Sequence, residues 1–154
     1  LTDGTITYTA DGVELKSFHA RDGAGIKLLP DAGIIPAIVS GRSSAATQRR
    51  AKELGIDHVV EGVKDKLPYV DEMRRKLDLP WEAVAFMGDD LTDIPPMRRC
   101  GFSAAPKDAA PEVRRIATYV CEHPGGRGAV REAIESLLRR QGAWENVLRG
   151  LEAT

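Results

Sequence analysis

The chain has 154 residues and a formal net charge of -1, with 22 Lys and Arg side chains against 23 Asp and Glu. This length is typical of one globular domain, so we expect residues 1–154 to form a single unit. The near-neutral charge and an aromatic content of 5% argue against a nucleic-acid-binding protein. No apolar run reaches the 18 residues of a membrane span, and two isolated cysteines fit a cytoplasmic location.

Residues 5–18 have the pattern of a β-hairpin, in which two alternating segments flank an Asp-Gly turn. Short apolar segments then alternate with helical patterns. The predicted strands are 34–39, 58–60, 83–87, 102–105 and 119–121, and the predicted helices are 22–33, 43–54, 66–77, 91–99, one that begins at Pro111, and 127–140. Asp22 is the expected N-cap of the first helix, and Ser43 and Ser44 are both candidates for the N-cap of the second. This alternation predicts an α/β fold, with a Rossmann-like, mostly parallel sheet and helices on both faces.

Polar residues follow each of the inner strands of this predicted sheet. Ser40-Gly41-Arg42 follows the first, Lys66 comes soon after the second, and Gly88-Asp89-Asp90 with Asp93 follows the third. The carboxyl ends of parallel strands share one edge, where ligands bind. The acids suit Mg²⁺ through oxygen, and the hydroxyl and ammonium groups suit phosphate.

Each of these features also has a plainer interpretation. Ser40-Gly41 is typical of a turn, and Lys66 alone is typical of a solvated helix residue. The Gly88-Asp89-Asp90 segment alone fits a turn and a helix N-cap as well as it fits a site. Their order along the chain, each at a strand end, favours the site.

These residues resemble motifs two, three and four of the haloacid dehalogenase superfamily. The segment Leu1-Thr2-Asp3-Gly4, the hairpin, Arg21-Asp22-Gly23 with Gly25-Ile26, and the late segment Gly125-Gly126-Arg127-Gly128-Ala129 are similar to the capless 3-deoxy-D-manno-octulosonate 8-phosphate phosphatase branch. The similarity extends to about residue 142.

The resemblance implies a Mg²⁺-dependent phosphomonoesterase that acts on a sugar phosphate through an aspartyl-phosphate. By motif, Ser40 and Gly41 bind phosphate, Lys66 neutralises it, and Asp89, Asp90 and Asp93 hold or orient the metal. Arg42, Arg21 and Arg127 are candidate substrate contacts. Members of the branch lack a cap domain and form homotetramers through their hairpins, and a neighbour's C-terminal tail closes the site. Here that tail is residues 143–154, in which Trp144 and Leu148 can pack on another subunit or fray.

The sequence departs from the family at its first motif, Asp-x-Asp-Gly-Val, which precedes the Leu-Thr-Asp-Gly segment. That motif holds the nucleophile and the general acid/base, and it ends the central strand. Without this strand its neighbours would lie two spacings, roughly 9–10 Å, apart. We therefore expect about ten or more residues before Leu1 in the natural protein.

Three other interpretations remain open. The substrate can be a nine-carbon, sialic-acid-type 9-phosphate, which the sequence separates poorly from the eight-carbon acid. The chain can be a catalytically inactive scaffold or tetramerisation module, although retention of Ser40, Lys66, Asp89 and Asp93 argues against it. A response-receiver domain is disfavoured because the acidic cluster comes late in the chain.

Overall fold

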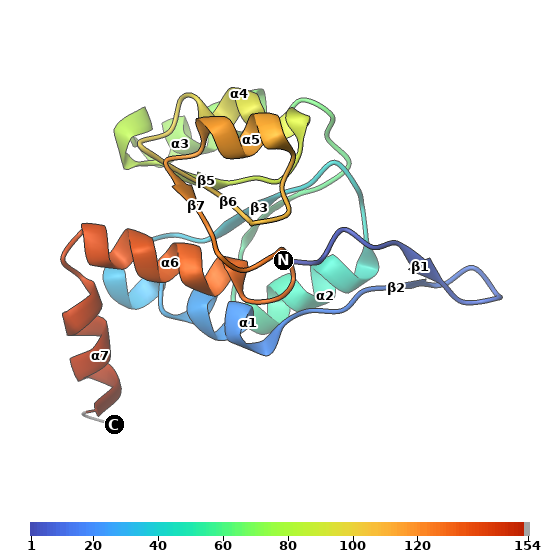
Figure 1. Ribbon diagram of the computed structural model, residues 1–154, viewed down its shortest axis with the longest axis horizontal. Coiled ribbons are helices and arrows are strands. Elements are labelled where there is room, and N and C mark those ends of the chain that lie inside the picture. Colours follow the sequence, from blue (N-terminus) through green and yellow to red (C-terminus); the bar gives the residue numbers. More distant parts are fainter. Residues whose placement is uncertain (153–154) are drawn as a thin grey trace.

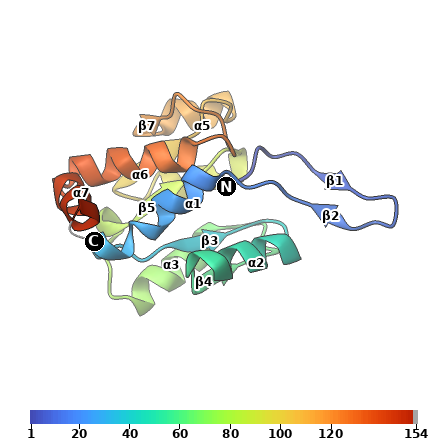
Figure 2. The same cartoon turned by 90° about the horizontal axis from the view of Figure 1, so that it is seen from below.

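The computed structural model describes residues 1–152 and shows an α/β arrangement with an arm (Figure 1). The arm is the predicted hairpin, and it projects from the body in Figures 1 and 2. Its strands pair in antiparallel fashion, Thr7 with Leu15 and Tyr8 with Glu14. The strands of the fold are β1 (Thr7–Tyr8), β2 (Glu14–Leu15), β3 (Ala37–Val39), β4 (His58–Val60), β5 (Ala85–Met87), β6 (Phe102–Ala105) and β7 (Tyr119–Val120).

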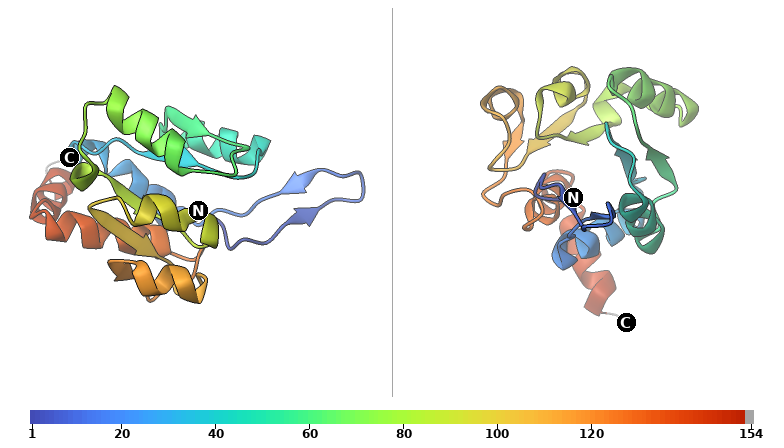
Figure 3. Two further views of the ribbon diagram at one scale, coloured as in Figure 1. Left: turned by 90° about the horizontal axis from the view of Figure 1, so that it is seen from above. Right: turned by 90° about the vertical axis from the view of Figure 1, so that its right-hand side faces the viewer.

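The parallel strands of the body form two separate sheets. One pairs β3 with β4, and the other has the order β5-β6-β7. Strand β6 has a partner on each side and is buried throughout, whereas Ala37 at the start of β3 and Ala85 at the start of β5 are exposed. The right-hand view of Figure 3 shows the two sheets side by side, with the N-terminus near the place where they face each other. Strands β3 and β5 are therefore neighbours in the layer without being hydrogen-bonded partners.

Helices cover both faces of this layer, which confirms the predicted fold class. Figures 1 and 3 place α3, α4 and α5 on one face and α1, α2 and α6 on the other. The helices are α1 (Ala20–Lys27), α2 (Ala45–Leu54), α3 (Leu67–Lys76), α4 (Ile94–Met97), α5 (Pro111–Ile116), α6 (Ala129–Arg140) and α7 (Trp144–Glu152), with short 3₁₀ turns η1 (Pro30–Ala32), η2 (Trp81–Ala83) and η3 (Leu91–Asp93). Among these helices, none is long and apolar enough to cross a membrane.

Several predicted helix ends match the structure, and two predicted caps do not. Gly33 and Gly55 end their segments in the left-handed conformation, where a residue without a Cβ fits best. Asp22 was predicted to cap its own helix, but α1 already begins at Ala20. Ser44 is the N-cap residue of α2, yet its side chain makes no capping hydrogen bond.

Asp22 caps a different helix instead. Its buried carboxylate accepts hydrogen bonds from the backbone N–H groups of Gly128 (3.3 Å) and Arg131 (2.9 Å), at the start of α6. The N-terminal N–H groups of a helix lack partners within the helix, and an anion there also interacts favourably with the helix dipole. This contact fixes α1 against α6 below the sheets.

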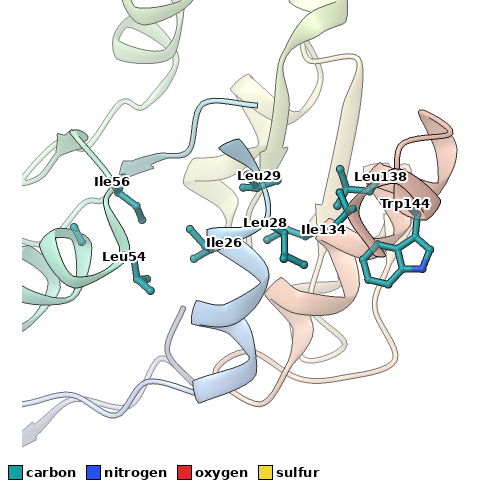
Figure 4. Packing of buried hydrophobic residues seen from close by; sticks show 10 residues of the cluster. Ile26, Leu28, Leu29, Leu54, Ile56, Ile134, Leu138 and Trp144 are labelled. Atoms are coloured by element: carbon teal, nitrogen blue, oxygen red, sulfur yellow. The ribbon is translucent and has the colours of Figure 1, made fainter. Parts of the chain in front are cut away.

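The largest apolar cluster lies between α1, α2, α6 and α7 (Figure 4). Its members include Ile26, Leu54, Ile134, Leu138 and Trp144, all less than a tenth exposed. Burial of each large aliphatic side chain contributes about 1.5–3 kcal/mol.

The C-terminal segment forms a helix that packs on its own chain. Trp144 and Val147 of α7 join the core, and Leu148 packs against it. The guanidinium of Arg139 lies 4.8 Å from the centroid of the Trp144 ring. Leu148 and Trp144 were expected to pack on another subunit or to fray, and both contact this chain's own core. Residues 153–154 of the predicted tail lie outside the described part.

Candidate active site

A buried ion pair joins the two sheets at their carboxyl edge. Lys66 lies at the start of α3, after β4, and Asp93 lies in η3, after β5. The Lys66 Nζ donates to Asp93 Oδ1 at 2.6 Å, and their side chains are 13% and 2% exposed. A buried charge pair stays ionised only with good geometry and further hydrogen bonds. The pair therefore needs the partners that the following loop supplies.

Those partners come from the backbone of the loop after β5. Asp93 Oδ2 accepts hydrogen bonds from the N–H groups of Asp89 (3.0 Å) and Asp90 (3.2 Å). Asp90 in turn caps η3 by accepting from the N–H of Leu91 at 2.8 Å. Gly88 allows this closeness, because a Cβ there would overlap the Asp93 side chain. Asp93 is thus fully engaged within the protein, and Asp90 serves as a helix cap.

Within residues 1–152, the carboxylate of Asp89 accepts none of the hydrogen bonds that hold Asp90 and Asp93 in this loop. Burial and the charge of Asp93 raise the pKa of Asp89, while the ammonium of Lys66 opposes the rise. Burial is the larger of the two causes, because an ionised carboxylate is costly to hold away from water. A cation bound at Asp89 would stabilise its ionised form.

The loop after β3 carries the serine of the predicted set. Ser40 Oγ donates to the carbonyl of Arg42 (2.9 Å) and accepts from the N–H of Arg42 (3.2 Å), which closes a tight turn. The N–H of Val63, after β4, donates to the carbonyl of Ser40 at 3.1 Å, and a Cβ on Gly41 would meet the Val63 carbonyl at 3.4 Å. The turn interpretation and the strand-end position therefore both hold for Ser40.

Arg42 points from this turn to the hairpin. Its Nη2 donates to Glu14 Oε1 (2.9 Å) and to the hydroxyl of Tyr8 (3.2 Å). These hydrogen bonds raise the pKa of Arg42, with the Tyr8 contact contributing most. No local pattern predicts either partner, because the hairpin lies about 30 residues away in the chain.

The N-terminal segment packs on the glycine-rich loop before α6. A Cβ at Gly126, where φ is +66°, would meet the Asp3 nitrogen at 2.5 Å. The N–H of Thr5 lowers the pKa of Asp3, and the charge of the exposed Arg127 adds to this effect. Arg127 therefore lies beside the N-terminal loop, whereas Arg21 lies on the exposed face of α1.

Known proteins share this arrangement of sheets and loops. A model of the haloacid dehalogenase-like hydrolase family matches residues 59–134. The 3-deoxy-D-manno-octulosonate 8-phosphate phosphatase of Escherichia coli K12 is 42% identical over 142 residues, which cover 92% of this chain and 76% of that protein. The chain belongs to this phosphatase family. The Moraxella catarrhalis phosphatase, crystallised with magnesium, phosphate and a KDO molecule, superposes with a TM-score of 0.94 at 39% identity, over 98% of this chain and 87% of that one.

The family of phosphomonoesterases to which the chain belongs uses Mg²⁺. A second solved relative, from Haemophilus influenzae, is a cobalt-bound form with 40% identity and a TM-score of 0.88, over 94% of this chain and 84% of that one. In residues 1–152 no group of three or more His, Cys, Asp or Glu side chains is arranged to hold a metal ion. Asp93 is hydrogen-bonded to Lys66, whereas the carboxylate of Asp89 suits the oxygen ligands that Mg²⁺ prefers. A metal-binding role for Asp89 stays a prediction.

Proposed function

We propose that the protein is a Mg²⁺-dependent phosphatase that hydrolyses 3-deoxy-D-manno-octulosonate 8-phosphate. The observation that carries the proposal is the buried Lys66–Asp93 pair beside Asp89, at the edge where parallel sheets bind ligands. Similarity over nine-tenths of the chain to phosphatases named for this substrate supports the same conclusion.

In this proposal Lys66 holds a phosphoryl oxygen and offsets its charge, while Asp93 fixes the ammonium in place. Asp89 holds Mg²⁺, which when bound neutralises charge on the phosphate. Asp90 and Asp93 orient the loop that carries Asp89. The Ser40 hydroxyl turns from the Arg42 carbonyl to bind a second phosphoryl oxygen, together with the N–H of Gly41, and Arg42 contacts the sugar acid. Arg21 and Arg127 are peripheral substrate contacts.

We further propose that the nucleophile belongs to a strand that precedes Leu1 and lies between β3 and β5. Those strands face each other without pairing, and Ala37 and Ala85 at their starts are exposed, as expected for edges that a further strand would cover.

The reaction then proceeds in two displacements. The aspartate of that strand attacks phosphorus, the bond from phosphorus to the sugar oxygen breaks, and a second aspartate of the same motif protonates the leaving alkoxide. Water then attacks the phosphorus of the aspartyl-phosphate and gives a proton to that second aspartate, while the bond from phosphorus to the nucleophilic aspartate breaks, so that phosphate is released and the carboxylate is regenerated.

Phosphate release from the sugar phosphate tests the proposal. The natural protein, with the residues that precede Leu1, is expected to hydrolyse it in the presence of Mg²⁺, and residues 1–154 alone are not. Asp89→Ala is expected to abolish turnover, whereas Asp71→Ala, on the outer part of α3, is the matched control. Turnover by Asp89→Ala equal to that of the unchanged protein would refute the metal role. A substrate panel that includes nine-carbon 9-phosphates decides between the two sugar classes.

The hairpin suggests how the protein assembles. Ile6, Tyr8, Val13 and Leu15 are each about half exposed on this arm. Apolar side chains gathered on a projecting element are typical of an interaction surface. We propose that the hairpins of four copies pack together, and sedimentation of the natural protein at the mass of a monomer would contradict this. The scaffold alternative predicts assembly with no hydrolysis of any sugar phosphate. The free thiols of Cys100 and Cys121 fit a cytoplasmic enzyme.

A further inference from the structure

Side chains of the hairpin form hydrogen bonds with the Ser40-Gly41-Arg42 loop and with helix α2, which follows it. Glu14 Oε1 accepts from Arg42 Nη2 at 2.9 Å, and Tyr8 accepts from the same nitrogen at 3.2 Å. Lys16 Nζ donates to Thr47 Oγ1 of α2 at 3.3 Å. The hairpin therefore contacts the loop and the helix at separate points, and these contacts fix the position of residues 8–16.

Glu14 is the centre of this network. Its side chain is 17% exposed, although it lies on a projecting arm, and its second oxygen is 3.9 Å from Lys16 Nζ. By contrast, the side chain of Arg42 is 50% exposed. The covered carboxylate of Glu14 has little freedom to move, whereas the half-exposed guanidinium of Arg42 has more. The hydrogen bond between them therefore fixes the orientation of Arg42.

The contacts leave Arg42 free to bind a ligand. A guanidinium has five N–H donors, and the two on Nη2 are used by Glu14 and Tyr8. Within residues 1–152, Nε and Nη1 make no hydrogen bond, so three donors remain. A fixed guanidinium with free donors binds carboxylate or phosphate oxygens at a smaller entropic cost than a mobile one.

We propose that Glu14 is a positioning residue that orients Arg42 for the anionic substrate, and that it couples seating of the hairpin to substrate binding. This inference rests on the proposed function, which assigns Arg42 to the substrate. The exposed Ile6, Val13 and Leu15 lie within two residues of Tyr8 or Glu14 on the same hairpin. A contact that covers these side chains also immobilises the segment that holds Arg42. Assembly through the hairpin thereby improves binding at each site.

The first test compares Glu14→Gln with the unchanged natural protein, with 3-deoxy-D-manno-octulosonate 8-phosphate as substrate. We expect KM to rise about tenfold and kcat to stay within about twofold, because Arg42 contacts the substrate in the ground state and the transition state alike. Tyr8→Phe, which removes one of the two hydrogen bonds, is expected to give a smaller rise. Glu53→Gln is the matched control, since Glu53 pairs with Arg49 and Arg50 on exposed turns of α2. A KM for Glu14→Gln within twofold of the unchanged value would overturn the proposal.

A double-mutant cycle separates positioning from a general structural effect. If Glu14 acts through Arg42, adding Glu14→Gln to Arg42→Gln raises KM no further. Full additivity of the two changes would overturn the proposal. Sedimentation of each variant shows whether the hairpins still assemble, and a KM that rises on dilution into monomers is the expected sign of coupling.

Calorimetric titration with the free sugar acid, 3-deoxy-D-manno-octulosonate, distinguishes failure of this inference from failure of the proposed function. If the unchanged protein hydrolyses no sugar phosphate, the proposed function fails. The Kd for this sugar acid is then still expected to rise in Glu14→Gln and to stay the same in Glu53→Gln. Equal Kd values in all three proteins would overturn the inference alone.

Discussion

Replacement of Asp93 by Asn removes one charge from the buried pair and leaves the shape of the side chain unchanged. The carboxylate is 2% exposed and accepts hydrogen bonds from Lys66 Nζ and from the N–H groups of Asp89 and Asp90. The Asn amide keeps one acceptor but turns an NH₂ group toward a donor, so at least one hydrogen bond is lost and Lys66 is left buried without its counter-charge. Breaking a buried pair in this way costs about 3–5 kcal/mol.

Urea unfolding followed by circular dichroism measures this loss. With a slope of about 2 kcal/mol per molar urea, the midpoint is expected to fall by about 2 M. Asp71→Asn is the control, because Asp71 bonds Arg74 (2.6 Å) and Arg75 (2.7 Å) on the surface of α3. A surface pair of this kind contributes about 1 kcal/mol or less. Equal, small losses in both variants would refute the view that the Lys66–Asp93 pair joins the two sheets.

Three further predictions concern the loop before α6 and the network around it. Gly126→Ala places a methyl group against the Asp3 nitrogen at a positive φ, so the free energy of unfolding is expected to fall by about 1–3 kcal/mol, as thermal denaturation would show. Asp22→Ala removes the cap of α6 and is expected to cost about 2 kcal/mol; a loss below 0.5 kcal/mol in the same assay would contradict it. Burial acts to raise the pKa of Glu132, but hydrogen bonds from backbone N–H groups and from His123 outweigh it and the pKa is lowered. The ionised carboxylate therefore stabilises the fold, and Glu132→Gln is expected to lower the free energy of unfolding by about 1–3 kcal/mol at pH 7. This difference between the two proteins is expected to shrink as the pH falls below about 4.3, where the carboxylate becomes protonated.

The succession of strands along the chain, and the polar residues that follow them, could be predicted from the sequence. Both depend only on patterns of neighbouring residues. The apolar runs before Ser40 and Gly88 are short and continuous, as in buried parallel strands, and the structure places both residues at the carboxyl edge. The roles assigned to them by resemblance stay predictions. The capping action of Asp22 had no local signal, since the sequence preference for Asp at a helix start does not reveal which helix it caps.

Contacts between distant segments account for the rest of what the sequence did not reveal. The pairing of Glu14 with Arg42 depends on how the hairpin leaves the body, and no pattern in either segment specifies it. The helix α7 did have a signal, because Trp144, Val147 and Leu148 follow helical spacing. The resemblance implies a tail that closes a neighbour's site, and that role stays a prediction.

The capping of α6 by Asp22 also has a consequence for the order in which the chain folds. The two hydrogen bonds join residues 106 and 109 positions apart. Closing a loop of this length lowers the entropy of the chain before the hydrogen bonds between its ends can form. Folds that are rich in such long-range contacts therefore form slowly. On the ribosome, α1 must wait for residue 131 to emerge before its buried carboxylate finds a partner. We expect the segments in between to remain only partly consolidated until that moment, and the final docking of α6 to limit the rate of folding.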